Sequence, residues 1–315
     1  MEKIKLGIST CLLGKNVRFD GGHKLDRYLT DTLGQFVEYV PVCPEMECGF
    51  GVPRESLRLV GDPQNPRLVT SRTNQDHTER MKAWAEKRVE ELETEDLCGY
   101  IFKGGSPSSG MERVKVYDSN GVPSKVGVGL FARAFMNHFP LLPVEEEGRL
   151  HDPRLRENFI ERIFALKRWR DELKEKQSLK ALIAFHTRNK LLLLAHSPQH
   201  YRQMGKLVAQ GKELPLKELY ARYQDDFQEA LRLKTTNKKH ANVLIHMLGY
   251  FKGQLAAAEK QEMLELIEQY RLELLPLVVP MTLVSHYVRK YEESYLKEQT
   301  YLQPHPAELH LRNHV

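Results

Sequence analysis

Three short segments carry the side chains of this 315-residue chain that are best suited to chemistry. They are Ser9-Thr10-Cys11-Leu12-Leu13-Gly14, Cys43-Pro44-Glu45 and Lys103-Gly104-Gly105-Ser106-Pro107-Ser108-Ser109-Gly110. Each follows an apolar run typical of a buried strand, at residues 4–8, 36–42 and 99–102. Ligands of open parallel sheets bind at the carboxyl ends of the strands. The sequence therefore predicts a site with two thiols, a carboxylate and a Gly/Ser-rich turn at one sheet edge.

The four cysteines all lie in the first hundred residues. This distribution is more typical of buried, catalytic or metal-binding thiols in a reducing compartment than of a disulfide framework. Cys98 begins an apolar run and is expected to be a buried small hydrophobe. The role of Cys48 stays open. His196 and His200 are not expected to bind metal, because Pro198 between them breaks a helical register.

Pattern alone does not give the Gly/Ser-rich segment a function. It lacks the Lys-Ser/Thr pair that ends a P-loop. It is not a nucleophile elbow either, because Ser108 occupies the position of that motif's last glycine. On pattern alone an ordinary turn is the simpler interpretation, and Arg54 and Lys103 are read as ion-paired side chains.

The segments together resemble the thiouracil desulfidase (TudS) family over residues 1 to about 175. The resemblance is carried by S-x-C-L-x-G at Cys11 with Arg18-Phe19-Asp20-Gly21, by Cys43-Pro44-Glu45 with Gly49 and Val52-Pro53-Arg54, and by Ser106-Pro107-Ser108. It implies an enzyme that uses a 4Fe-4S cluster to remove sulfur from thiolated pyrimidines without net redox chemistry. Soft, thiolate-ligated iron suits a thiocarbonyl sulfur.

The resemblance also implies roles for individual residues. Cys11 and Cys43 fall on two cluster-ligand positions, Glu45 on a catalytic carboxylate that could activate water, and Ser106 on a catalytic serine. Ser109 stands where the family has its third cysteine. Because a serine hydroxyl is a hard ligand without an accessible anion at neutral pH, a labile or absent cluster is expected. Three explanations stay open: a targeted Cys→Ser change, a natural variant in which Cys48 compensates, and a degenerate relative that only binds.

The elements that position these residues form two predicted domains. Residues 1–175 alternate β-rich runs with amphipathic helical patterns and are predicted to be an α/β domain with a mainly parallel sheet. Residues 176–315 have helical spacing in five segments, at 179–195, 200–210, 214–233, 238–251 and 256–275, and are predicted to be all-α. The segment from Phe185 to Pro198 resembles an uncharacterised helical domain fused behind TudS-like domains, in what look like enzymes that convert 4-thiouridine in transfer RNA to uridine.

Charge separates the two halves of the chain. Residues 1–177 hold 28 basic and 28 acidic side chains, so residues 178–315 carry the whole formal charge of +5. A basic half suggests a polyanion partner, and the resemblance implies that this partner is tRNA carrying 4-thiouridine. The candidate RNA-binding residues are Arg188, Lys190, Arg202, Lys206, Lys238 and Lys239.

The expected function is cluster-dependent desulfuration of 4-thiouridine in tRNA, in the cytoplasm, without a membrane or an obligate protein partner. No apolar run approaches the roughly 20 residues of a membrane span, and no signal peptide is recognised at Met1. Two alternatives stay open. One is desulfuration of free thiouracil or another small thiolated compound, and the other is a non-catalytic RNA-binding protein.

Overall fold

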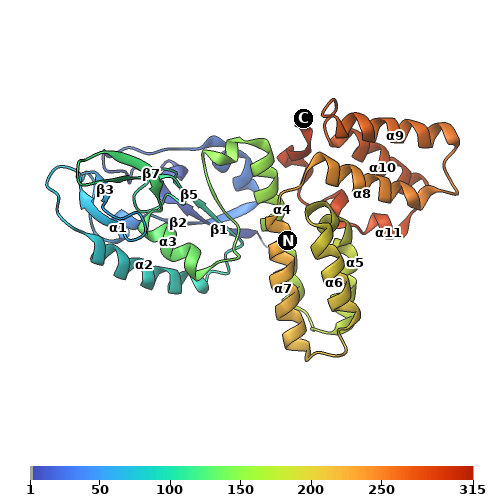
Figure 1. Cartoon of the computed structure of the whole chain (residues 1–315), viewed down its shortest axis with the longest axis horizontal. Coiled ribbons are helices and arrows are strands. Elements are labelled where there is room, and N and C mark those ends of the chain that lie inside the picture. Colours follow the sequence, from blue (N-terminus) through green and yellow to red (C-terminus); the bar gives the residue numbers. More distant parts are fainter. Residues whose placement is uncertain (1–2, 315) are drawn as a thin grey trace. The chain divides into compact units, whose positions relative to one another are not determined.

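The strand that precedes Cys11 lies inside a fully parallel sheet. In the computed structural model, which describes residues 3–314, this sheet has the order β2-β1-β5-β8 (Figure 1). Its strands are β1 (Ile4–Ser9), β2 (Val37–Val42), β5 (Tyr100–Phe102) and β8 (Val144–Glu146). Ser9 pairs with Val42 at the carboxyl ends of β1 and β2, so these strands end level. The mainly parallel α/β prediction is confirmed.

A second sheet of four short strands accompanies the first. It has the order β4-β3-β6-β7, with β3 (Leu57–Val60), β4 (Arg67–Thr70), β6 (Val114–Tyr117) and β7 (Pro123–Gly127). The β3–β4 and β6–β7 pairs are antiparallel and the β3–β6 pair is parallel. The strands of residues 1–155 therefore divide into two sheets instead of the single one expected.

Helices complete the first unit around an aromatic core. They are α1 (Pro44–Glu47), α2 (Thr78–Glu93) and α3 (Leu130–His138). The ring of Tyr100 on β5 lies 4.7 Å from that of Phe135 on α3, and Trp84 of α2 lies 5.4 Å from Phe131 of α3, between ring centroids. These contacts fix β5, and with it the start of the Gly/Ser-rich segment.

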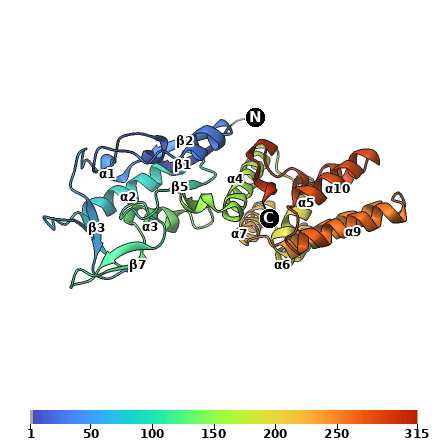
Figure 2. The same ribbon diagram turned by 90° about the horizontal axis from the view of Figure 1, so that it is seen from above.

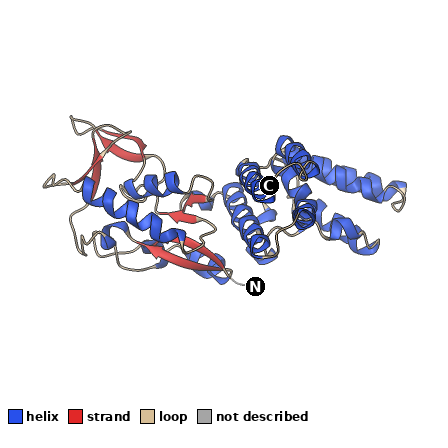
Figure 3. Cartoon of the chain, turned by 90° about the horizontal axis from the view of Figure 1, so that it is seen from below, coloured by secondary structure: helices blue, strands red, loops and turns tan. Residues whose placement is uncertain are grey.

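The second unit contains helices and no strands among the residues described, as predicted (Figure 3). Most of its helices match the expected segments, whereas α10 was not expected. None of the described helices combines the length and apolar character needed to cross a membrane. The helices are α4 (Pro153–Lys174), α5 (Leu179–His196), α6 (Pro198–Ala209), α7 (Leu216–Arg232), α8 (Asn237–Leu248), α9 (Ala257–Arg271), α10 (Val278–Lys290) and α11 (Ser294–Lys297).

The boundary between the units lies about one helix earlier than the predicted 175/176. The chain divides into residues 1–155 and 156–315, so nearly all of α4 belongs with the helical unit. Trp169 of α4 explains this, since its indole lies 5.1 Å from the rings of both Phe185 and Tyr223 and donates to Gln224 Oε1 at 2.8 Å. With this boundary, residues 1–155 hold 21 basic and 23 acidic side chains, and residues 156–315 hold 26 and 19.

A buried charge cluster ties the end of the chain to α4. Glu161 accepts from Arg312 at 2.8 Å, and its other oxygen lies 3.1 Å from His196 Nε2. His196 Nδ1 contacts the carbonyl of Leu233 at 2.7 Å, so both of its ring nitrogens have protein partners. Helices α9 and α10 pack against α8 and against each other in the same unit. Figure 2 shows α9 and α10.

Candidate active site

The strand order brings the three sequence segments to one edge of the parallel sheet. Strands β2, β1 and β5 are neighbours and point the same way, so the residues that follow them meet. Cys11 lies in the 3₁₀ turn after β1, Cys43 precedes α1 after β2, and residues 103–110 follow β5. Together they line a cavity of about 330 Å³. All five residues singled out by sequence line it: Cys11, Cys43, Glu45, Ser106 and Ser109.

Two of the four thiols face this cavity, and both are largely buried. Cys43 Sγ lies 3.7 Å from Glu45 Oε2 and 4.0 Å from the carbonyl oxygen of Val17. Burial, followed by the charge of Glu45, raises the pKa of Cys43 to about 12, and burial also raises the pKa of Cys11. Both thiols therefore keep their protons at neutral pH unless a metal displaces them.

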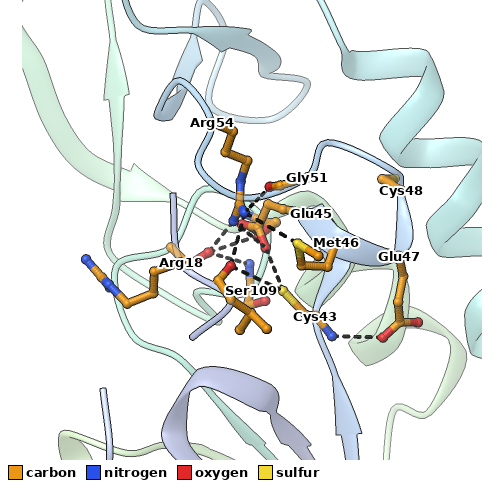
Figure 4. Close-up of polar contacts among 12 residues, drawn as sticks. Arg18, Cys43, Glu45, Met46, Glu47, Cys48, Gly51, Arg54 and Ser109 are labelled. Carbon is orange, nitrogen blue, oxygen red and sulfur yellow. Dashed lines mark hydrogen bonds and ion pairs between the residues drawn. The ribbon is translucent and has the colours of Figure 1, made fainter. Parts of the chain in front are cut away.

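Cys48 points away from the cavity, into the hydrophobic core. Its Sγ lies 3.8 Å from Met81 Sδ and 3.9 Å from the carbonyl oxygen of Arg80, both on α2. It packs with Leu59, Leu68, Val114, Val116 and Leu130, and Figure 4 shows it apart from the cavity residues. Because Cys48 does not line the cavity, the hypothesis that it compensates for Ser109 has no support in this geometry. Cys98 is buried, as expected.

Glu45 is held from two sides at the cavity wall (Figure 4). Its Oε1 accepts a hydrogen bond from Ser108 Oγ at 2.5 Å, and its Oε2 lies 3.8 Å from Arg54 Nη2. The side chains of Glu45 and Arg54 are only 14% and 10% exposed. Low exposure keeps this ion pair from being screened as a surface pair would be. Arg54 was expected to be ion-paired, and its partner in the structure is Glu45.

Ser108 is the functional candidate that sequence reasoning missed. Its side chain is fully buried, and its Oγ lies 3.0 Å from Ser106 Oγ as well as 2.5 Å from Glu45. A hydroxyl has one hydrogen to donate. Because Ser108 donates to the ionised carboxylate, Ser106 is the donor to Ser108, which gives the directed chain Ser106→Ser108→Glu45. The Ser-Pro-Ser spacing was visible, but nothing in it indicated which serine would reach Glu45.

The loop carrying these serines is held by two other elements. Gly110 N–H donates to the carbonyl of Ser106 at 2.8 Å, and Ala132 N–H of α3 donates to that of Ser108 at 3.1 Å. A Cβ on Gly129, just before α3, would lie 2.5 Å from the carbonyl of Ser108, so only glycine fits there. Glu147, after β8, accepts from the Gly104 N–H and pairs with Lys103 at 2.5 Å. Lys103 is thus ion-paired, as the sequence indicated.

The cations proposed to bind RNA lie on α5, α6 and α8, and they differ in their contacts. Arg202 and Lys206 of α6 line a separate cavity between α6 and α7 with Arg222, Asp225 and Asp226. Arg188 of α5 pairs with Glu172 at 3.2 Å. Lys239 Nζ donates to the carbonyl oxygens of His196 and Lys234, so it binds two backbone groups that precede it in the chain. Lys190 on α5 is half-buried and Lys238 on α8 is exposed.

Comparisons with known proteins also divide the chain into an N-terminal and a C-terminal region. The family described as 2-thiouracil desulfurase matches residues 6–147, and the family described as protein of unknown function DUF1722 matches residues 190–306. The uncharacterized protein YbgA of Escherichia coli K12 is 34% identical over 42% of this chain and 79% of its own length. The uncharacterized protein YbbK of Bacillus subtilis 168 is 27% identical over 33% of this chain and 71% of its own.

One solved structure is also similar. It is titled 4Fe-4S-dependent thiouracil desulfidase TudS and is 28% identical to this chain. The match covers 48% of this chain and 95% of that structure, with a TM-score of 0.40.

Proposed function

This chain belongs to the 2-thiouracil desulfurase family, with a DUF1722 region behind the desulfurase domain, and on this premise we propose that it hydrolyses the carbon-sulfur bond of 4-thiouridine in tRNA to give uridine. The overall reaction replaces the thiocarbonyl sulfur with the oxygen of water and releases sulfide, so no oxidant or reductant is needed. The observation that carries the proposal is the convergence of Cys11, Cys43, Glu45 and Ser106 on one cavity.

The donor atoms around the cavity fit an iron-sulfur cluster with two soft ligands and one hard one. Cys11, Cys43 and Ser109 would hold it. Among residues 3–314 no group of three or more His, Cys, Asp and Glu side chains is placed to bind a metal. A cluster bound here would supply a Lewis-acidic iron for the thiocarbonyl sulfur. Ser109 predicts that it is held less firmly than by three thiolates.

Proton transfer falls to the chain's own hydrogen-bonded residues. Glu45, held by Arg54 and Ser108, is placed to take a proton from the attacking water as a general base. Once protonated, Glu45 can donate to Ser108, and Ser108 can then donate to Ser106. This reversal frees the Ser106 hydroxyl hydrogen to point into the cavity, where a proton is needed on the substrate. Two serines therefore connect the base to the reacting ring.

The second unit supports RNA as the substrate through its charge. Residues 156–315 carry a formal charge of +7, whereas residues 1–155 carry −2. Basic units of this kind bind the phosphate backbone with strong salt dependence. A thiolated base in folded RNA must leave its stack to reach a buried site, so a unit that grips the RNA separately has a physical purpose.

The test of the substrate compares three thiolated compounds: free thiouracil, 4-thiouridine and thiolated tRNA. The proposal expects the highest kcat/KM with tRNA. Replacing Arg202 and Lys206 by Gln should weaken tRNA binding and lower the slope of log affinity against log salt by about two, because each cation neutralises one phosphate. The exposed Lys252 and Lys260, both replaced by Gln, are the control for the same reduction of net charge elsewhere in the unit. Equal kcat/KM for free base and tRNA would contradict the proposal.

The cavity itself favours one alternative. Its volume of about 330 Å³ is at the lower end of small-molecule sites, which run from roughly 300 to 1,000 Å³. A free thiolated pyrimidine is therefore a second candidate substrate. Turnover of free thiouracil that is unchanged by the Arg202 and Lys206 replacements would favour this candidate.

A further inference from the structure

Phe19 places an apolar ring in solvent at the edge of the candidate active site. It lines the cavity with Cys11 and Cys43, yet 41% of its surface is exposed. The aromatic rings of Tyr100, Phe102, Phe131 and Phe135 in the same unit are fully buried. Apolar and aromatic side chains that line a small-molecule site usually contact the ligand. Phe19 is therefore a candidate for direct contact with whatever enters this cavity.

The backbone that carries Phe19 is fixed by hydrogen bonds. Arg54 N–H donates to the carbonyl of Phe19 at 3.0 Å, and Gly21 N–H donates to that of Arg18 at 3.0 Å. Gly21 has a φ of +76°, the left-handed conformation that glycine adopts without strain. Gly22 N–H donates to Asp20 Oδ1 at 3.0 Å. The turn thus fixes the backbone that carries the ring before a ligand arrives, which lowers the entropy cost of binding.

Arg54 connects this turn to Glu45. Its Nη1 donates to the carbonyl of Val17 at 3.0 Å, and its Nη2 lies 3.8 Å from Glu45 Oε2. One largely buried guanidinium therefore contacts both the stretch of chain leading to Phe19 and the proposed general base. A flat ring resting on Phe19 would lie in the cavity whose wall also carries Glu45.

The charges around Phe19 suit an anionic nucleotide. Four cations line the cavity and Glu45 is its sole carboxylate among the residues described. Arg54 pairs with Glu45, Lys103 pairs with Glu147 and Arg18 pairs with Asp20. Lys24 has no ion pair with a carboxylate among the described residues. The Arg18 guanidinium carbon lies 5.4 Å from the centre of the Phe19 ring, and its Nε lies 3.4 Å from Asp20.

We propose that Phe19 is the platform on which the thiolated pyrimidine of a nucleotide stacks, with Arg18 behind the ring. This inference rests on the proposed function, because it names how that same site takes its substrate. Stacking on a phenyl ring is favourable for any base, and a cation on an aromatic ring adds an attractive contact. Phe19 then supplies binding energy and orientation, while Glu45 and Ser106 act on protons.

The first test uses fluorescence, so it does not depend on turnover. Phe19→Trp gives the chain a third tryptophan, in addition to Trp84 and Trp169. Titration with 4-thiouridine 5′-monophosphate should quench the added emission of Phe19→Trp, whereas the unaltered chain gives the background from its two native tryptophans. Quenching no greater in Phe19→Trp than in the unaltered chain would overturn the proposal.

The second test separates binding from chemistry. Phe19→Ala should weaken binding of the nucleotide about 5- to 150-fold, the range found on removing one aromatic partner of a base. Its KM should rise by a similar factor with a nearly unchanged kcat. Phe19→Leu keeps apolar volume but has no aromatic face, so it should resemble Phe19→Ala. Affinity in Phe19→Leu equal to that of the unaltered chain would show that apolar contact suffices and would refute stacking.

Failure of this inference can be told apart from failure of the proposed function. If the unaltered chain releases no sulfide from any thiolated substrate but Phe19→Trp is quenched, the function fails and the stacking site stands. If sulfide is released and Phe19→Ala has the KM of the unaltered chain, the function stands and the stacking inference is wrong.

Discussion

Ser108→Ala removes the middle residue of the hydrogen-bonded chain without touching the cavity wall. Ser108 is fully buried and is not among the cavity-lining residues, whereas Ser106 and Glu45 are. The change deletes the donor 2.5 Å from Glu45 Oε1 and the acceptor 3.0 Å from Ser106 Oγ. It therefore disconnects the proposed base from the proposed proton donor while leaving both side chains in place.

The size of the expected effect follows from the type of hydrogen bond that is removed. A hydrogen bond to a charged group contributes about 1.5–3 kcal/mol. If this contribution is realised in the transition state, at about 1.36 kcal/mol for each factor of ten, kcat falls roughly 10- to 150-fold. KM should change little, because Ser108 does not line the cavity.

The assay is sulfide release and loss of 4-thiouridine absorbance at saturating and at low substrate concentration. Ser9→Ala is the matched control. Ser9 is buried and lines the same cavity, but its Oγ accepts from the main-chain N–H of Lys103 at 2.9 Å. A kcat for Ser108→Ala within twofold of the unaltered chain, with Ser106→Ala inactive, would refute the proton chain.

Three further predictions concern other parts of the chain. Ser109→Cys should retain more iron than the unaltered chain after anaerobic reconstitution and a chelator wash, because thiolate is the softer ligand. Equal iron content per chain would contradict the assignment of Ser109 to a ligand position. Cys48→Ala should leave the iron content unchanged. It should lower the free energy of unfolding, measured by urea denaturation, by about 1 kcal/mol, the order expected for a small buried group. Loss of iron would show that Cys48 does contribute to the metal site. The helical unit should lose stability on mild acidification, because burial lowers the pKa of His186 to about 4 and of His240 to about 3. Below the ordinary histidine pKa of about 6.5 the unfolded chain takes up protons that the folded chain does not. Stability therefore falls from about pH 6.5 toward pH 4. A thermal unfolding temperature that does not change over that range would contradict this prediction.

The position of the site could be predicted from the sequence because the ends of neighbouring parallel strands determine it. Short apolar runs before Cys11, Cys43 and Lys103 indicated parallel strands, and neighbouring parallel strands necessarily end at one edge. The helical second unit followed in the same way from periodicity. In both cases a local sequence pattern was enough to predict the structure.

Side-chain direction could not be predicted, because it depends on tertiary packing. Cys43 and Cys48 flank the four-residue helix α1, yet one thiol faces the cavity and the other packs on Met81 of α2. Lys239 is a predicted RNA-binding residue, and the sequence did not show that the fold brings two carbonyl oxygens to its Nζ. The boundary at residue 155 was also hidden, because the amphipathic pattern of α4 does not say which core its Trp169 joins.

Removal of sulfur from 4-thiouridine in tRNA at this cavity can be measured with three forms of the chain. The unaltered chain, Ser109→Cys and Ser109→Cys with Glu45→Gln are reconstituted anaerobically with iron and sulfide, freed of excess sulfide and mixed with thiolated tRNA. We expect loss of 4-thiouridine absorbance with one sulfide released per base, fastest in Ser109→Cys and abolished when Glu45→Gln is added. Iron-loaded Ser109→Cys that leaves the 4-thiouridine of tRNA intact would contradict this expectation.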